Sequence, residues 1–139
     1  MKLINLAKIA REEAYAPYSK VKVGAALLTK EGSIYTGCNI ENLRYGELIC
    51  AERNAIYTAM ANKQREFTEI AIVANYRGEL KPCRICRSAI AELCPEIKIK
   101  TLNLKDNKML ELSLKELYNN KISYEVRSIL RIILRKIFK

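Results

Sequence analysis

The 139-residue chain contains no histidine. Histidine is the commonest metal ligand in proteins and the side chain most often used for proton transfer near neutral pH. Any metal site or acid–base chemistry in this chain must therefore rely on other side chains or on water.

Long apolar segments are also absent. No uninterrupted apolar run approaches the roughly 20 residues needed to cross a bilayer, and residues 1–11 lack the apolar segment of a signal peptide. The sequence shows no internal repeat and no low-complexity segment. With a length typical of one domain, these features predict a single-domain cytoplasmic protein over residues 1–139.

Cysteine is scarce and odd in number, with five residues in the chain. An odd number argues against a disulfide framework and favours a reducing compartment in which thiols bind metal. The formal net charge is +10. Half of it comes from Lys121–Lys139, where six basic residues face one acid, Glu125, for a net charge of +5.

Hydrophobic periodicity predicts an α/β protein with a sheet of about five strands and helices on its faces. Helices are expected over residues 3–14, from about residue 50 to residue 60, and from residues 83–86 onward. Strands are expected at 21–29, 33–39, 69–75, 97–104 and about 109–112, with a hairpin turn at 30–32.

Two cysteine segments stand at predicted helix starts: Cys50-Ala51-Glu52 and, about thirty residues later, Pro82-Cys83-Arg84-Ile85-Cys86. Three thiolates can hold zinc and leave its fourth tetrahedral position to water, while a nearby carboxylate moves that water's protons. The exposed amides and positive dipole end of a helix favour thiolate over thiol. The pattern predicts a zinc site built for hydrolysis.

Other interpretations of these cysteines are a structural zinc site, redox chemistry or simple core packing. A structural site usually needs a fourth protein ligand, and the remaining candidates are Cys38, in a predicted strand, and Cys94, at a helix end. We favour Cys50, Cys83 and Cys86 as the three ligands. The alternative is that one spare cysteine joins them.

The chain resembles the small, homotetrameric type of cytidine deaminase, within the superfamily of zinc-dependent deaminases. The matching segments follow one another from about residue 10 to residue 95: Tyr15-Ala16-Pro17-Tyr18-Ser19, Val23-Gly24-Ala25-Ala26-Leu27-Leu28, Gly37-Cys38-Asn39-Ile40-Glu41-Asn42, Tyr45-Gly46, Cys50-Ala51-Glu52-Arg53, Pro82-Cys83 and Cys86-Arg87. The resemblance implies a three-layer α/β/α fold with a mixed sheet, one zinc ion per subunit, and a homotetramer whose pockets are shared between subunits.

The resemblance also implies roles for individual residues. Cys50, Cys83 and Cys86 would bind zinc, and Glu52 would move protons while water attacks C4 of the pyrimidine. Other matches would hold the substrate or the sulfurs. Asn39 and Glu41 would bind the ribose hydroxyls, and the Ala51 backbone would bind the base. Arg53 and Arg87 would hydrogen-bond the ligand sulfurs and so relieve the negative charge of three thiolates on Zn²⁺.

The chain departs from the family pattern at several positions near the predicted site. Arg84 brings bulk and charge into the metal loop, Val21 replaces a usual aromatic, and Glu47 adds a carboxylate ahead of Cys50. A C-terminal phenylalanine that covers a neighbouring subunit's base is missing, with Tyr118 or Tyr124 as candidate substitutes.

The C-terminal segment at about 122–139 has an apolar stripe and basic residues spaced four apart, which predicts a basic amphipathic helix. We favour packing of its apolar face on the domain or across a subunit interface. Contact with nucleic acid or an acidic membrane is the alternative.

Four functions follow from these observations. The favoured one is hydrolytic deamination of cytidine or deoxycytidine in pyrimidine salvage. The alternatives are deamination of a modified cytosine nucleoside or a blasticidin-like antibiotic, editing of nucleic acid anchored by the basic tail, and a non-catalytic zinc-binding interaction protein. The presence of Glu52 argues against the last, and the Asn39 and Glu41 pair favours a free nucleoside over a nucleic acid.

Overall fold

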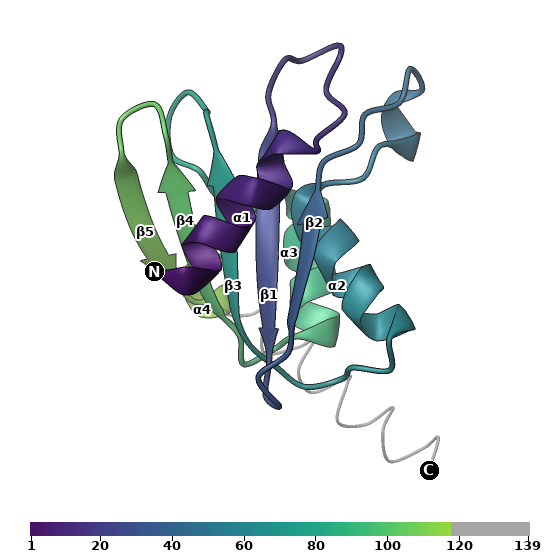
Figure 1. Ribbon diagram of the computed structural model, residues 1–139, viewed down its shortest axis with the longest axis vertical. Helices are drawn as coiled ribbons and strands as arrows, with labels where there is room; N and C mark the ends of the chain where they lie inside the picture. Colours follow the sequence, from purple (N-terminus) through teal and green to yellow (C-terminus); the bar gives the residue numbers. More distant parts are fainter. Residues whose placement is uncertain (118–139) are drawn as a thin grey trace.

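A five-stranded mixed sheet forms the centre of the molecule (Figure 1). The computed structural model describes residues 1–117. The strand order is β2-β1-β3-β4-β5; β3 and β4 are parallel, and the other neighbouring pairs are antiparallel. The elements in chain order are α1 (Lys2–Glu12), β1 (Val23–Thr29), β2 (Ile34–Cys38), the 3₁₀ turn η1 (Tyr45–Glu47), α2 (Ala51–Ala61), β3 (Phe67–Ala74), α3 (Arg84–Leu93), β4 (Lys98–Asn103), β5 (Lys108–Leu112) and α4 (Leu114–Leu117).

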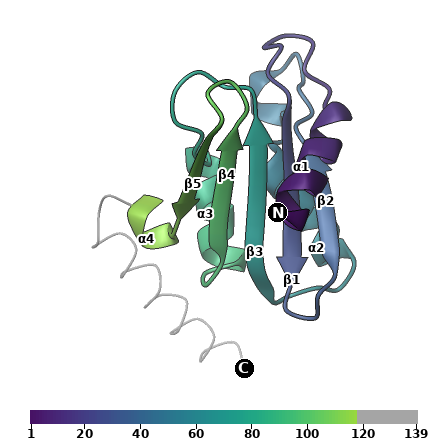
Figure 2. The ribbon, with the colours of Figure 1, turned by 60° about the vertical axis from the view of Figure 1, so that its left-hand side comes forward.

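Helices cover both faces of the sheet. Figure 1 shows α1 in front of the sheet and α2 and α3 behind it, and the turned view of Figure 2 shows the same separation. The arrangement confirms the predicted α/β fold with a mixed sheet of five strands between helical layers.

Each helical layer has its own apolar core. On the α1 side the buried side chains are Leu3, Ile4, Ala7, Ala26, Ala71, Val73 and Leu102. The larger core, on the side of α2 and α3, includes Leu27, Ile56, Ile70, Ile72, Ile90 and Ile99. Because β3 is buried on both faces from Ile70 to Ala74, its sequence is a continuous apolar run, as expected of a central strand.

Two glycines allow helices to lie unusually close to the sheet. A side chain at Gly37 of β2 would collide with the backbone of Ala51 and Ala55 in α2, and one at Gly24 of β1 would collide with the backbone of α1. The contact at Gly37 lies beside the first turn of α2, directly after Cys50. This close contact therefore fixes the position of Cys50, at the start of α2, relative to β2.

The predicted elements are present, with small differences at their ends. The first strand begins at Val23 rather than residue 21, because the Asn39 side chain bonds the backbone of Val21 and Val23 in place of a partner strand. The third strand begins two residues earlier than predicted, at Phe67. The described residues do not include the predicted C-terminal helix at 122–139, nor the two candidate substitutes for the missing phenylalanine, Tyr118 and Tyr124.

Within residues 1–117, no helix has both the length and the apolar character needed to cross a membrane.

Candidate metal centre and active site

The sulfur atoms of Cys50, Cys83 and Cys86 converge at one point, all within 4.8 Å of one another. The Cys50 and Cys83 sulfurs are 3.8 Å apart. Zinc–sulfur bonds of about 2.3 Å at a tetrahedral angle would place two sulfurs about 3.8 Å apart. The three residues therefore fit a zinc ion by donor type and by spacing.

Helix starts position all three cysteines. Cys50 is the N-cap of α2 and Cys83 the N-cap of α3, each with extended backbone angles. Cys86 lies in the first turn of α3, where its backbone N–H donates to the Cys83 sulfur at 3.4 Å. The positive ends of two helix dipoles thus face the sulfurs, as expected for thiolate ligands.

The Cys50 and Cys86 sulfurs lie in the same cluster, and each shifts the pKa of the other. The hydrogen bond with Cys86 lowers the pKa of Cys50 to about 5, and the same bond, followed by burial, raises the pKa of Cys86. These opposite shifts favour ionisation of Cys50 over that of Cys86. A sulfur anion is thus already stabilised where a zinc ligand is required.

Glu52 lies in the first turn of α2, two residues after Cys50, and its side chain is only 6% exposed. Removal from water raises the pKa of its carboxyl from 4.5 to about 7, with a smaller upward effect from the Cys50 charge. A buried carboxyl beside three sulfurs is costly to maintain for packing alone. Its position suits proton transfer at the centre.

The two predicted charge-relieving arginines have different contacts. Arg53 places Nη2 3.9 Å from the Cys50 sulfur and 3.3 Å from the Leu48 carbonyl, and its buried Nε has no hydrogen-bond partner among the described residues. Arg87 donates from Nη1 to the Leu117 carbonyl at 2.8 Å, which joins α3 to the end of α4. Arg53 thus directly contacts a ligand sulfur.

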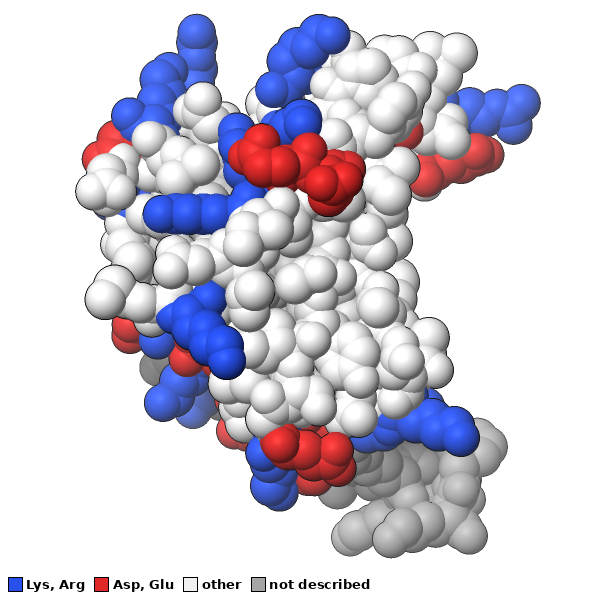
Figure 3. All heavy atoms as spheres, in the orientation of Figure 1, with Lys and Arg blue, Asp and Glu red and all other residues white. Residues whose placement is uncertain are grey.

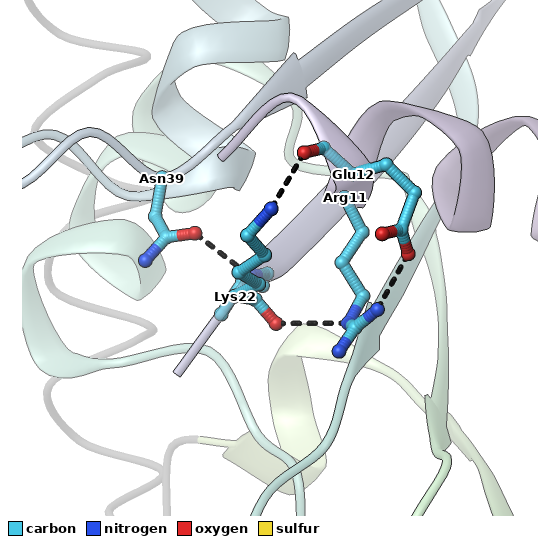
Figure 4. Close-up of polar contacts among 5 residues, drawn as sticks. Arg11, Glu12, Lys22 and Asn39 are labelled. Carbon is cyan, nitrogen blue, oxygen red and sulfur yellow. Dashed lines mark hydrogen bonds and ion pairs between the residues drawn. The ribbon is translucent and has the colours of Figure 1, made fainter. Parts of the chain in front are cut away.

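Asn39 holds the segment that precedes β1. Its Oδ1 accepts from the Val23 N–H at 2.7 Å, and its Nδ2 donates to the Val21 carbonyl at 2.8 Å. Figure 4 shows Asn39 facing this segment from one side, while Arg11 and Lys22 tie it to the end of α1. An amide has two donors and two acceptor lone pairs, so Asn39 retains one of each.

Glu41 fastens the loop after α1. Its carboxylate accepts from the backbone N–H of Tyr18 at 2.9 Å and of Ser19 at 3.2 Å. Hydrogen bonding from Ser19 is the main cause that lowers the pKa of Glu41, so this exposed carboxyl stays ionised. Asn39 and Glu41 together hold both segments of the loop region beside β1.

The sequence pattern of the family described as cytidine and deoxycytidylate deaminase zinc-binding region matches residues 1–101. The chain belongs to this family. The match and the cysteine cluster together identify one zinc site in the chain.

Individual members of the family are similar over most of the chain. A cytidine deaminase from Sporosarcina psychrophila is 53% identical over 93 residues, which cover 67% of this chain and 68% of that protein. One from Halalkalibacterium halodurans is 46% identical over 116 residues, 83% of this chain and 87% of the relative. The crystal structure of cytidine deaminase from Burkholderia pseudomallei superposes with a TM-score of 0.80 at 43% identity, covering 86% of this chain and 95% of that one.

The remaining predicted residues of this deaminase-family chain differ in burial and position. Ala51 is fully buried in the first turn of α2. Glu47, in η1, is exposed and forms an ion pair in which its Oε1 lies 3.8 Å from Arg44 Nη1. Arg84 is exposed at the first position of α3, and Val21 is partly buried in the wall of a separate cavity.

Asn103, the last residue of β4, was not among the predicted site residues. It is 2% exposed and forms hydrogen bonds with the loop after β3 and with the turn after β4. An asparagine at the end of a strand is the only sequence signal for it, and many strands end in asparagine at a turn.

Proposed function

We propose that the chain catalyses hydrolytic deamination of cytidine or deoxycytidine to the uridine nucleoside and ammonia, as a cytoplasmic enzyme of pyrimidine salvage. The observation that carries the proposal is the convergence of three cysteine sulfurs beside the buried Glu52 at the start of α2. The family membership and the cytidine deaminases similar to this chain support the same reaction. The five free cysteines agree with a reducing compartment.

Zinc bound by Cys50, Cys83 and Cys86 supplies Lewis acidity and an activated water. Glu52 takes a proton from the attacking water and delivers it to N3 of the pyrimidine. It then takes the proton of the hydroxyl group now on C4 and transfers it to the amine, so that the C4–N bond breaks, ammonia leaves and the C4 carbonyl forms. One water is consumed and one ammonia released for each cytidine converted. Because the chain has no histidine, no imidazole competes for this role.

The other predicted residues position the substrate and balance charge. The remaining donor and acceptor of Asn39, with the carboxylate of Glu41, bind the ribose hydroxyls, and the Ala51 backbone holds the base. Arg53 lowers the negative charge of the sulfurs through its contact with Cys50. Arg87, in the same helix as Cys86, adds a second positive charge near the sulfurs, and its bond to the Leu117 carbonyl fixes its side chain.

Ammonia release by the purified zinc-loaded protein tests this function directly. The substrates are cytidine, deoxycytidine, methylated cytosines, blasticidin S and oligonucleotides. We expect turnover of cytidine or deoxycytidine and a loss of at least about a thousandfold in Glu52→Gln, with zinc retained. The absence of activity on every free nucleoside would contradict the proposal.

A modified cytosine nucleoside or a blasticidin-like antibiotic is the second candidate substrate. A blasticidin-S deaminase from Bacillus cereus is 33% identical over 103 residues, 67% of this chain and 74% of that protein. The exposed Arg84 between two ligand cysteines offers a cation for a carboxylate-bearing substrate. Turnover of blasticidin S above that of cytidine in the same panel would favour this candidate, whereas turnover of oligonucleotides alone would favour editing.

We further propose that the enzyme is a homotetramer. Several large apolar side chains in the segment between β2 and α2, in α2 and in α3 are exposed in the single chain: Leu43 (82%), Ile85 (57%), Ile40 (44%) and Tyr57 (44%). Such a group of exposed apolar residues is typical of a subunit interface. Light scattering coupled to gel filtration should give four times the chain mass, and a monomer would contradict the proposal.

A further inference from the structure

An open cavity of about 660 Å³ lies at the end of the sheet where β1 begins and β3 and β4 end. Its volume is in the range of small-molecule sites. The lining consists of two cations, two residues with amide or hydroxyl groups and two apolar residues: Arg77, Lys105, Asn75, Tyr76, Val21 and Leu104. None of the three cysteines or Glu52 lines it, so the cavity is distinct from the metal centre.

The two cations of this cavity have no acidic partner among residues 1–117. The neighbouring lysines do: Lys81 and Lys108 bind the same carboxylate, Glu79, at 2.6 Å and 3.5 Å. Figure 3 shows Lys and Arg side chains on both sides of a notch at the upper end of the molecule, where the loops after α1, β3 and β4 gather in Figure 1. Arg77 and Lys105 therefore leave positive charge available to an anion.

A single buried side chain fixes the two loops that carry these cations. Asn103 Oδ1 accepts from the backbone N–H of Tyr76 at 3.2 Å and of Lys105 at 3.1 Å. Its Nδ2 donates to the carbonyls of Tyr76 at 2.9 Å and Gly78 at 3.0 Å. These four bonds use the full capacity of the amide, so the backbone on both sides of Arg77 and that of Lys105 are held in place before any ligand arrives.

The cavity adjoins the predicted ribose-binding side chain. Val21 lines the cavity, and its carbonyl accepts a hydrogen bond from Asn39 Nδ2 at 2.8 Å. A ribose bound at Asn39 would place its hydroxyls near this wall. A group attached to one of those oxygens could then extend toward Arg77 and Lys105.

We propose that this cavity is an anion subsite that binds a phosphate group. The position of this subsite beside a bound ribose rests on the proposed nucleoside deamination. The binding of an anion by Arg77 and Lys105 does not depend on that function. Arg77 offers the planar fork of donors that suits phosphate, Lys105 a second positive charge, and Tyr76 and Asn75 neutral polar groups. The bound group is either the phosphate that a nucleotide carries on its ribose or a free inorganic phosphate ion.

Titration of the zinc-loaded protein with inorganic phosphate at low ionic strength, by calorimetry, tests the subsite. We expect the double variant Arg77→Gln/Lys105→Gln to bind phosphate about tenfold more weakly than wild type. Lys98→Gln removes one lysine at the opposite end of β4 and should leave binding unchanged. Phosphate binding that survives the double substitution would assign the ion to the metal centre and overturn the proposal. An equal loss of phosphate affinity in Lys98→Gln and in the double variant would also overturn it.

Titration with cytidine 5′-monophosphate distinguishes the two sources of phosphate. Binding tighter than that of both cytidine and inorganic phosphate, and weakened by the double substitution, identifies a nucleotide. Binding no tighter than that of inorganic phosphate identifies the free ion. Deamination of cytidine and deoxycytidine by wild type is measured separately. Absence of activity on every free nucleoside defeats the proposed function, whereas absence of phosphate binding that depends on Arg77 and Lys105 defeats the subsite alone.

Discussion

Individual residues at the metal centre are distinguished by what they contact rather than by their type. Cys50, Cys83 and Cys86 bring their sulfurs within 4.8 Å of one another, whereas Cys38 and Cys94 do not join this cluster. The open alternative, in which a spare cysteine completes the site, is therefore not supported by the geometry of the described residues. A three-sulfur site keeps one zinc position for water.

Substitution of a ligand should remove zinc, whereas substitution of a spare cysteine should not. We expect Cys83→Ser to reduce the zinc content well below one ion per chain, because a serine hydroxyl is a far poorer zinc ligand than a thiolate. Cys38→Ser is the matched control and should retain one ion. Elemental analysis after dialysis measures both, and a full zinc content in Cys83→Ser would contradict the ligand assignment.

The contact between Arg53 and the Cys50 sulfur predicts a kinetic effect without loss of fold. We expect Arg53→Ala to keep its circular dichroism spectrum and to lose roughly tenfold or more in kcat, because the negative charge of the thiolates is then less relieved. Steady-state kinetics on cytidine measure the change. Unchanged kinetics would show that Arg53 does not modulate the centre.

At the scale of elements, the positions of α2 and α3 decide whether a metal site exists. Each helix starts at a cysteine, and α2 lies against β2 where Gly37 leaves room for its backbone. Asn39 and Glu41 follow β2 directly and hold the loops beside the same end of the sheet. The site is thus assembled from the ends of elements whose interiors form the core.

The close approach of α2 to β2 can be tested at Gly37. We expect Gly37→Ala to lower the free energy of unfolding by about 2–3 kcal/mol, since the added methyl would meet helix backbone that no rotamer change can move. Gly46→Ala is the control, because a side chain there has open space in the described structure. Chemical denaturation measures both, and equal stabilities would exclude the predicted clash.

The sequence predicted most elements and the metal residues because their signals are local. Apolar periodicity marks the strands and helices, and the cysteines lie beside the helix starts that orient them. Strand ends were less well predicted: Val21 continues an apolar alternation, yet the Asn39 side chain holds it off the sheet. The role of Asn103 could not be predicted from its place at a strand end, because three of its four hydrogen bonds join residues 25 to 27 positions away in the loop after β3.

For the whole molecule, bound zinc should stabilise the folded chain. The ligands Cys50 and Cys83 lie 33 residues apart in sequence, at the starts of two helices. The unfolded chain does not hold the three sulfurs together. We expect removal of zinc by a chelator to lower the thermal unfolding midpoint by at least about 10 °C, with recovery on adding zinc back. Calorimetry measures the shift; an unchanged midpoint in protein confirmed to be zinc-free would mean that the metal does not support the fold.

The sequence alone was sufficient to predict the chemistry of this protein, from three cysteines and a glutamate at two helix starts in a chain without histidine. Within each cysteine segment these residues are near one another along the chain, and the family resemblance joins the two segments. The folded structure was needed to show which side chains from distant segments come together: Asn39 with Val21, Asn103 with the loop after β3, and Arg77 with Lys105 around one cavity. The physical reason is that these contacts arise from the packing and register of whole elements, which no local pattern encodes.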